Sequence, residues 1–318
     1  MSAPLRVGTR ASALALWQTE HVRTRLHAAG YRTERVELRT TGDMVQDIPL
    51  ARIGSRALFT RQIDDAMLAG RIDLAVHSLK DLPTVLPEGI ALVAVAERED
   101  PRDALVGRGP LGWDDLPRHG IVATSSLRRR AQLLHLRPDL EVRDVRGNVD
   151  TRLRKLDATS EWSAILLAVA GLVRLGLDRR IGERLRPELI LPAPGQGALA
   201  VTARRGDAAA AAAARAVHHP ETARAIAAER ACLRTLEGGC QVPVGAHATL
   251  AGETVRLHGR VVSLKGERAV EAVETGLASD EAGADALGVR LAERLLANGA
   301  DAVLAEARAA AAPMVPEP

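Results

Sequence analysis

Over the first two thirds of the chain, short runs of apolar residues, or of alternating apolar and polar residues, alternate with longer amphipathic segments. The runs typical of strands are Leu5–Thr9, Glu34–Arg39, Asp73–His77, Ile90–Ala96, Ile121–Thr124, Leu140–Val145 and Ala164–Val169. Helical spacing predicts helices at Ala11–Ala29, Arg56–Leu68, Leu127–Leu136 and Val149–Leu156. This alternation favours an α/β fold with largely parallel sheets covered by helices on both faces.

Two segments have the composition of connectors between lobes. Glu97–Arg102 is charged and contains a proline, and Leu191–Gly197 is rich in proline and glycine. Two crossings between one pair of lobes return the chain to the first lobe. We therefore expect Ala198–Ala203 to supply a returning strand, and the two lobes to be doubly connected.

The pattern changes after the alanine tract Ala208–Ala214, which we interpret as a surface helix. An amphipathic helix, three strands joined by tight turns and a closing helix are predicted at Pro220–Leu236, Gly245–Leu250, Thr254–Val262, Arg268–Val273 and Asp280–Ala297. These elements indicate a small α+β module with a three-stranded antiparallel sheet. The expected domains are residues 1–97 with 198–216, residues 102–192, and residues 219–305, followed by a disordered tail over 306–318.

Composition excludes several classes of protein. Hydrophobic residues make up 47% and charged residues 26%, as in ordinary globular proteins. The longest apolar run, Ala164–Val173, is too short for a bilayer, and the N-terminus has no secretory signal, so we expect a cytoplasmic protein. Aromatic residues, at 2%, are too few for the stacking platforms of single-strand binders. Only Lys80, Lys155 and Lys265 are lysines, so the basic pI reflects a general preference for arginine; we expect no nucleic-acid or membrane partner.

The usual signatures of nucleotide, metalloprotease and serine-hydrolase sites are absent. The chain lacks GxxxxGK[ST], HExxH and GxSxG motifs. Two cysteines are too few for a structural zinc site or a disulfide framework, and the His218–His219 pair does not supply a metal site. No metal is expected.

Three strand-to-helix junctions combine helix-capping residues with arginines. They are Thr9–Ser12, Thr124–Arg130 and Arg146–Arg154. A helix start favours an anion, and such junctions meet at the carboxyl edge of a parallel sheet. Together they predict a cleft for a ligand with many carboxylates or phosphates; the alternative is ordinary caps beside solvated arginines.

Three further side chains are candidates for chemistry. Asp81, beside Lys80 at the end of a buried strand, is suited to holding a cation or moving protons, although a strand-end ion pair is an equal alternative. Cys240 lies in the glycine turn GGCQVP and is expected to be more accessible than Cys232, which we assign to the core of a helix.

Nine motifs, in order along the chain, carry a resemblance to a known family. They are VGTRASALALWQ, LARIGSRALFTRQID, DLAVHSLKDLPT, EREDPRDAL, ATSSLRRRAQL, DVRGNVDTRL, LLAVAGLVRLGL, LPAPGQGAL and LEGGCQVPVGA. The chain resembles porphobilinogen deaminase, also called hydroxymethylbilane synthase, over nearly its whole length. The resemblance implies two lobes like those of type II periplasmic binding proteins and a small third domain.

The resemblance also implies the activity and the cofactor. Cys240 would carry a dipyrromethane cofactor through a thioether, and four porphobilinogen units would be joined head to tail on this primer, each releasing ammonia. Water would then free the linear hydroxymethylbilane. The family is expected to be monomeric and to pass its product to uroporphyrinogen-III synthase. A cytoplasmic two-lobed solute-binding or sensor protein for a polyanion is the alternative function.

The resemblance assigns roles to individual residues. Asp81 matches the catalytic carboxylate, which would stabilise the positive charge left when ammonia departs. The matching positions for cofactor and substrate binding are Arg6, Arg10, Ser12, Arg52, Arg56, Phe59, Lys80, Thr124, Ser125, Ser126, Arg128, Arg129, Arg146, Arg152, Arg174 and Gln196. The family often has lysine where Arg52 and Arg56 stand, which we interpret as drift. Phe59 falls on the family's lid segment, with a core role as the alternative.

Overall fold

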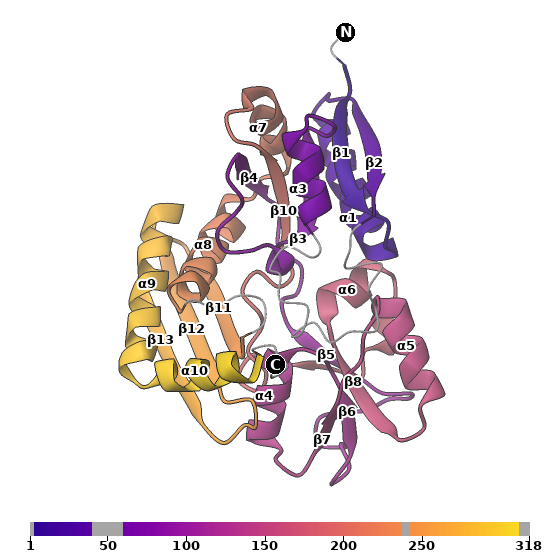
Figure 1. Ribbon diagram of the computed structural model, residues 1–318, viewed down its shortest axis with the longest axis vertical. Helices are drawn as coiled ribbons and strands as arrows, with labels where there is room; N and C mark the ends of the chain where they lie inside the picture. The colour runs from indigo at the N-terminus through magenta and orange to yellow at the C-terminus, as the bar shows by residue number, and fades with distance from the viewer. Residues whose placement is uncertain (1–2, 40–59, 237–241, 312–318) are drawn as a thin grey trace, which may run out of the picture.

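The computed structural model describes residues 3–39, 60–236 and 242–311. Figure 1 shows an upper lobe, a lower lobe and a third domain that lies beside both. Each of the three parts is built around its own sheet.

The sheet of the first lobe has five strands in the order β2-β1-β3-β10-β4. Its strands are β1 (Leu5–Arg10), β2 (Thr33–Leu38), β3 (Leu74–Ser78), β4 (Ile90–Val95) and β10 (Leu199–Arg204). The helices and short 3₁₀ turns of this lobe are α1 (Ala13–Ala28), α3 (Arg61–Leu68), α7 (Ala208–Ala214), η2 (Leu79–Asp81) and η4 (Arg215–Val217). β10 runs antiparallel between β3 and β4, so the expected returning strand is confirmed.

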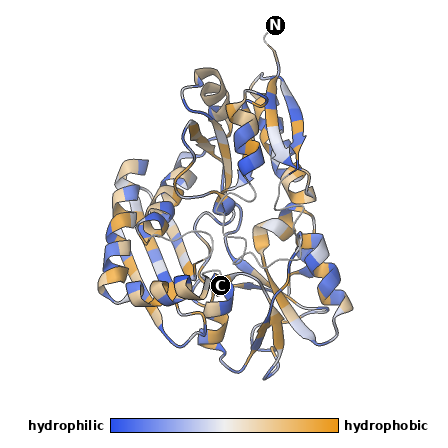
Figure 2. Ribbon diagram, in the orientation of Figure 1, coloured by the Kyte–Doolittle hydropathy of each residue, from blue (hydrophilic) through white to orange (hydrophobic). Residues whose placement is uncertain are grey.

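The second lobe repeats this arrangement in the order β7-β6-β8-β5-β9. Its strands are β5 (Asp103–Val106), β6 (Ile121–Ala123), β7 (Glu141–Arg143), β8 (Trp162–Ala168) and β9 (Glu183–Leu185). Its helices are α4 (Leu127–Leu136), α5 (Val149–Ala158), α6 (Val169–Arg174) and η3 (Asp178–Arg180). Hydrophobic residues predominate along β6 and β8, which lie between two buried clusters (Figure 2).

The two lobes share one topological rule. In each sheet the fourth strand follows directly on a crossing between the lobes: β5 after the first crossing and β10 after the second. Each of these strands is antiparallel to the neighbour on either side. This is the arrangement of type II periplasmic-binding-protein lobes, and the predicted fold class is confirmed.

The third domain contains the antiparallel sheet β11-β12-β13. The strands are β11 (Val244–Ala251), β12 (Thr254–Val262) and β13 (Ala269–Leu277), and the helices are α8 (Pro220–Thr235), α9 (Glu281–Ala297) and α10 (Ala300–Ala311). Leu257 of the sheet, Cys232 of α8 and Leu291 of α9 belong to one buried core. Burial raises the pKa of the Cys232 thiol to about 12, with a contribution from Glu229, so this cysteine is the core residue that was predicted.

The chain differs from the prediction near its C-terminus. α10 continues through Ala311, beyond Glu306, where a disordered tail was expected to begin. Val303, Leu304 and Ala307 are buried, and their spacing places them on one helical face against the core of the third domain. Residues 306–311 are therefore helical, and only residues 312–318 of the predicted tail lie outside the described ranges.

Candidate active site between the lobes

The predicted helix caps lie where strands of both lobes end. In the first lobe, the Ser12 hydroxyl accepts a hydrogen bond from the Ala15 N–H at 3.3 Å and begins α1. In the second lobe, the Ser126 hydroxyl accepts one from the Arg129 N–H at 3.4 Å and begins α4. These hydroxyl groups therefore fix the helix starts at the carboxyl edges of the two sheets.

Two further hydroxyl groups stabilise the loop before α4. The Thr124 hydroxyl accepts a hydrogen bond from the Ser126 N–H at 3.2 Å. The Ser125 hydroxyl donates to the Val145 carbonyl at 2.9 Å and accepts from the Val145 N–H at 3.1 Å. Ser125 thus joins the loop after β6 to the loop after β7, and both loops carry predicted binding residues.

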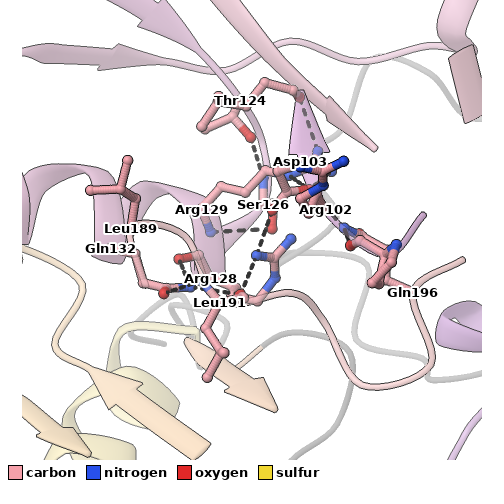
Figure 3. Close-up of polar contacts among 12 residues, drawn as sticks. Arg102, Asp103, Thr124, Ser126, Arg128, Arg129, Gln132, Leu189, Leu191 and Gln196 are labelled. Atoms are coloured by element: carbon pink, nitrogen blue, oxygen red, sulfur yellow. Dashed lines mark hydrogen bonds and ion pairs between the residues drawn. The ribbon is translucent and has the colours of Figure 1, made fainter. Parts of the chain in front are cut away.

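A buried carboxylate, Asp103, binds the two arginines Arg128 and Arg129, which we call the arginine cluster (Figure 3). Arg128 donates through Nη1 to Asp103 Oδ2 at 2.7 Å. Arg129 donates to Oδ1 through Nε at 3.0 Å and through Nη2 at 2.6 Å. Both arginines are 5% exposed, so they are paired in the interior and are not solvated surface residues.

Arg128 and Arg129 stabilise the ionised form of Asp103. Burial by itself would raise the pKa of this carboxyl group, but the attraction of Arg128 and Arg129 and their hydrogen bonds hold it well below its usual range. Asp103 is therefore a carboxylate at every physiological pH. It balances one of the two buried positive charges.

Gln196 connects this cluster to the first lobe. Its Nε2 donates to Asp103 Oδ1 at 2.9 Å and to the Pro101 carbonyl at 2.7 Å. Its Oε1 accepts from Lys80 Nζ at 3.2 Å. Lys80 lies on the turn η2 beside Asp81, so the second crossing joins the arginine cluster of one lobe to the candidate catalytic turn of the other.

Arg152 of the second lobe is affected by charged residues of both lobes. Burial, with smaller contributions from Arg129 and Arg146, lowers the pKa of Arg152 to about 10, and Asp81 of the opposite lobe opposes this shift. The Asp81 side chain is exposed on its turn. Asp81 of the first lobe is therefore near enough to Arg152 of the second lobe to affect its charge.

The guanidinium group of Arg146 has a buried nitrogen with no partner among the described residues. Nη1 of Arg146 is buried and has no hydrogen-bond acceptor within the part of the chain that the structure describes. Arg152 donates through Nε to the Gly147 carbonyl at 2.8 Å. The loop after β7 thus presents positive charge that the described residues do not neutralise.

Other predicted residues lie at different places. Arg174 donates to the Gly197 carbonyl at 2.6 Å and lies 5.7 Å from the centre of the Trp17 ring, so it joins α6 to α1 and the second crossing. Arg10 ends β1 at the carboxyl edge. Arg6 lies toward the opposite edge, where it forms a two-point ion pair with Asp73 through Nε at 3.0 Å and Nη2 at 2.7 Å.

The structure thus places Arg6 near the start of β1, away from Arg10 at the end of that strand. Four other predicted site residues lie outside the described residues: Arg52, Arg56, Phe59 and Cys240. The strand that follows Cys240 is nevertheless placed. The Ala246 N–H of β11 donates to the Pro192 carbonyl at 3.0 Å, next to Leu191, whose carbonyl accepts from Arg128 at 2.7 Å.

Sequence reasoning missed Asp103 and Glu229. Asp103 stands in the family motif EREDPRDAL, directly after the segment Glu97–Arg102 that was interpreted as a charged connector. Glu229 follows two alanines in the middle of an amphipathic helix, yet its side chain is fully buried. An isolated charge on an apolar helical face was the available signal for the second residue, because such a charge requires a partner.

No group of three or more His, Cys, Asp or Glu side chains within the described ranges is arranged to hold a metal ion. No helix of those ranges combines the length and hydropathy needed to cross a bilayer.

Family models match most of the chain. "Porphobilinogen deaminase, dipyromethane cofactor binding domain" matches residues 5–212, and "Porphobilinogen deaminase, C-terminal domain" matches residues 223–297. The porphobilinogen deaminase of Rubrobacter xylanophilus is 53% identical over 305 residues, covering 96% of this chain and 97% of the relative. That of Geobacter metallireducens is 48% identical over 304 residues, covering 95% and 94%.

Solved structures with a similar outline are more distant. The methionine-binding protein MetQ aligns with a TM-score of 0.42 and 13% identity over 67% of this chain and 89% of that chain. A periplasmic substrate-binding protein of an ABC transporter from Coxiella burnetii gives 0.43 and 14% over 68% and 92%.

Proposed function

Since the chain belongs to the porphobilinogen deaminase family, we propose how its own residues carry out the family's reaction. The enzyme joins four porphobilinogen units head to tail on a covalent dipyrromethane primer, releases ammonia at each addition and frees hydroxymethylbilane by hydrolysis. The alternative of a solute-binding protein is set aside, because the relatives that span the chain are deaminases.

The residues between the lobes fit a cofactor that carries several carboxylates. The observation that carries this proposal is the buried Nη1 of Arg146, a donor with no acceptor among the described residues. The repulsion that Arg152 receives from Arg129 and Arg146 supports a site that gathers positive charge. Acetate and propionate groups would neutralise that charge and accept the remaining hydrogen bonds. When bound, the dipyrromethane supplies the primer to which substrate units are added.

Arg128 and Arg129 have different donors left for a ligand. Arg128 is held through Nη1, by Asp103 and by the Leu191 carbonyl, so its Nε–Nη2 edge remains for a carboxylate. Arg129 uses Nε and Nη2 on Asp103 and Nη1 on the Leu166 carbonyl. We assign side-on carboxylate binding to Arg128 and a mainly electrostatic contribution to Arg129.

Asp81 is the proposed catalytic residue. Its carboxylate lies on an exposed turn and acts electrostatically on Arg152 of the opposite lobe. Loss of ammonia from porphobilinogen leaves positive charge on the pyrrole nitrogen, and a nearby carboxylate stabilises that charge and accepts a proton later in the addition. Lys80 and Arg10 are assigned to the carboxylates of the substrate, whose reacting end lies at Asp81.

The remaining assignments follow the resemblance and the local contacts. Cys240 is the proposed thioether anchor, and Arg52, Arg56 and Phe59 are proposed substrate-binding residues. Ser12, Thr124, Ser125 and Ser126 hold the helix starts, while Arg174 and Gln196 connect the lobes through the second crossing.

Finer assignments concern the setting of the enzyme. We propose that it acts as a monomer in the cytoplasm and passes hydroxymethylbilane to uroporphyrinogen-III synthase. We also retain the domain limits 1–97 with 198–216, 102–192 and 219–305.

The proposed function is tested on the purified protein. Ehrlich's reagent should colour the denatured chain, and mass spectrometry should place a dipyrrole on the peptide that contains Cys240. The native protein should release ammonia and hydroxymethylbilane from porphobilinogen in a ratio of four to one. An active protein whose Cys240 is an unmodified thiol would overturn the proposed mechanism.

A further inference from the structure

Asp103 occupies an unusual position in the chain. It is the first residue of β5, directly after the first crossing, and its side chain is fully buried. It accepts four hydrogen bonds, from Arg128, Arg129 and Gln196. Its partners come from α4 of the second lobe and from the second crossing, so one carboxylate joins three segments that are distant in sequence.

The carboxylate also fixes which way the Gln196 amide faces. A carboxylate only accepts hydrogen bonds, so the NH₂ group of the amide must face Asp103. This leaves Oε1 of Gln196 for Lys80 Nζ, at 3.2 Å. An oxygen is the only end of the amide that can accept from an ammonium group. The orientation at Asp103 therefore determines the contact at Lys80.

We propose that Asp103 is a positioning residue of the transferase, which holds Arg128 and Arg129 for the cofactor and, through Gln196, holds Lys80 beside Asp81. The inference rests on the roles assigned above to Arg128, Lys80 and Asp81. Because the Asp103 carboxylate is engaged by Arg128, Arg129 and Gln196, it is assigned no contact of its own with substrate or cofactor. It acts by fixing the positions of Arg128 and Arg129 in the second lobe and, through Gln196, of Lys80 in the first lobe.

Asp103 has two branches of contacts, one to Arg128 and Arg129 and one through Gln196 to Lys80. Two substitutions distinguish them. Asp103→Asn removes the charge, and its NH₂ group must replace either Oδ1, which accepts from Arg129 and Gln196, or Oδ2, which accepts from Arg128. In either orientation an arginine loses its acceptor, so the variant tests the contact with the arginines. Gln196→Met keeps the length of the side chain but removes the amide, so only the branch to Lys80 is lost, while both arginines keep Asp103.

Asp73 provides a matched control. It is also a carboxylate held by two arginines, through Arg6 Nη2 at 2.7 Å and Arg204 Nη2 at 3.2 Å, but at the opposite edge of the first sheet. Asp73→Asn removes the same kind of contact from the same molecule. A change in loading or turnover that depends only on stability would appear in this variant as well.

The experiment compares the four purified holoenzymes. The readouts are covalent dipyrrole per folded chain, measured with Ehrlich's reagent and by mass, the Tm, and kcat and KM for porphobilinogen per loaded chain. We expect Asp103→Asn to reduce loading by roughly thirtyfold or more, the loss typical when one partner of a buried charge pair is removed. We expect Gln196→Met to load normally but to lose roughly tenfold in kcat/KM, as when a hydrogen bond to a charged group is lost.

Each outcome decides the proposal. Normal loading in Asp103→Asn, or equal losses in Asp103→Asn and Asp73→Asn at equal Tm, would overturn it. If Asp103→Asn does not fold, Gln196→Met decides: slowed turnover with full loading supports the proposal, and unchanged turnover overturns it. A parent enzyme without covalent pyrrole and without product would instead refute the proposed function itself.

Discussion

Glu229 of α8 and Arg98 of the first crossing form a two-point ion pair, with Nη1 2.6 Å from Oε1 and Nη2 3.1 Å from Oε2. The fully buried Glu229 carboxylate also accepts from the N–H groups of Gly195 at 2.7 Å and Ala248 at 2.8 Å. Gly195 belongs to the second crossing and Ala248 to β11. One carboxylate thus fastens the third domain to both connections between the lobes.

Glu229→Gln should therefore strongly destabilise the protein. The substitution leaves the Arg98 guanidinium, whose side chain is 11% exposed, without its counter-charge. Removing one partner of a buried pair typically costs about 3–5 kcal/mol. Equilibrium urea unfolding measures this change. The exposed pair of Arg154 and Asp150 is the control, since Asp150→Asn should change the free energy of unfolding by less than about 0.5 kcal/mol. Equal effects in the two variants would contradict the structural assignment of Glu229.

The two cysteines should behave oppositely. Cys240→Ser should fold but carry no covalent pyrrole and show no activity, because a hydroxyl group does not replace the thiolate nucleophile. Cys232→Ser should keep the pyrrole and the turnover while losing roughly 1–3 kcal/mol of stability, since its hydroxyl would enter an apolar core. Mass spectrometry and the Ehrlich colour measure the covalent pyrrole, product formation from porphobilinogen measures turnover, and thermal unfolding measures stability. An exchange of the two phenotypes would place the anchor at Cys232.

Asp81→Asn should separate binding from chemistry. Asparagine keeps the size of aspartate but cannot neutralise a developing cation or accept a proton. The variant, loaded with preformed tetrapyrrole, should retain its cofactor and slow elongation by ~10²–10⁴. Quench-flow with separation of the successive enzyme complexes measures each addition. Turnover within about threefold of the parent, well inside that expected loss, would move the catalytic role to another residue.

Lys80 should set the alkaline limit of activity. Burial and the nearby Arg129 lower its pKa to about 8, although Asp81 and Asp103 oppose this. The ammonium form is present below that pH and is lost as the pH rises through it, so kcat/KM should fall above about 8. Lys80→Arg keeps its charge at higher pH and should move this decline upward. An unchanged alkaline limb in the arginine variant would assign the decline to another group.

Arg128→Leu and Arg129→Leu should both impair cofactor assembly or the first additions. Each leaves a buried charge on Asp103 less well balanced, and Arg128→Leu also removes an Nε–Nη2 edge that no described residue is recorded to occupy. We expect losses in loading of roughly thirtyfold or more. Loading is measured per folded chain, so that lost stability is not counted as lost binding. Normal loading and turnover in both variants would exclude these arginines from the site.

Regular periodicity made much of the fold predictable. The strand predicted at Thr254–Val262 is β12 without change, and α4 coincides with the predicted Leu127–Leu136. β5 was missed because it directly follows the charged segment interpreted as a connector, and β9 because only Leu185 of its three residues is buried. They exist because neighbouring strands supply their hydrogen bonds.

The site was predictable where local chemistry defines it. Ser12 and Ser126 were correctly interpreted as helix caps, since capping depends on residues only a few positions away. The central role of Asp103 was not predictable, because its partners stand 25, 26 and 93 positions further along the chain. In sequence it is one more charge directly after the charged connector Glu97–Arg102, and only the folded chain buries it.

The return of β10 to the first sheet has a consequence for the order in which the protein folds during synthesis. The second sheet is contiguous and is complete once Leu185 has left the ribosome. The first sheet, although it begins at Leu5, cannot connect β4 to β3 until residues 199–204 have emerged. The nascent chain therefore finishes its downstream lobe before its upstream one, the reverse of the usual N-terminal-first sequence of domain folding.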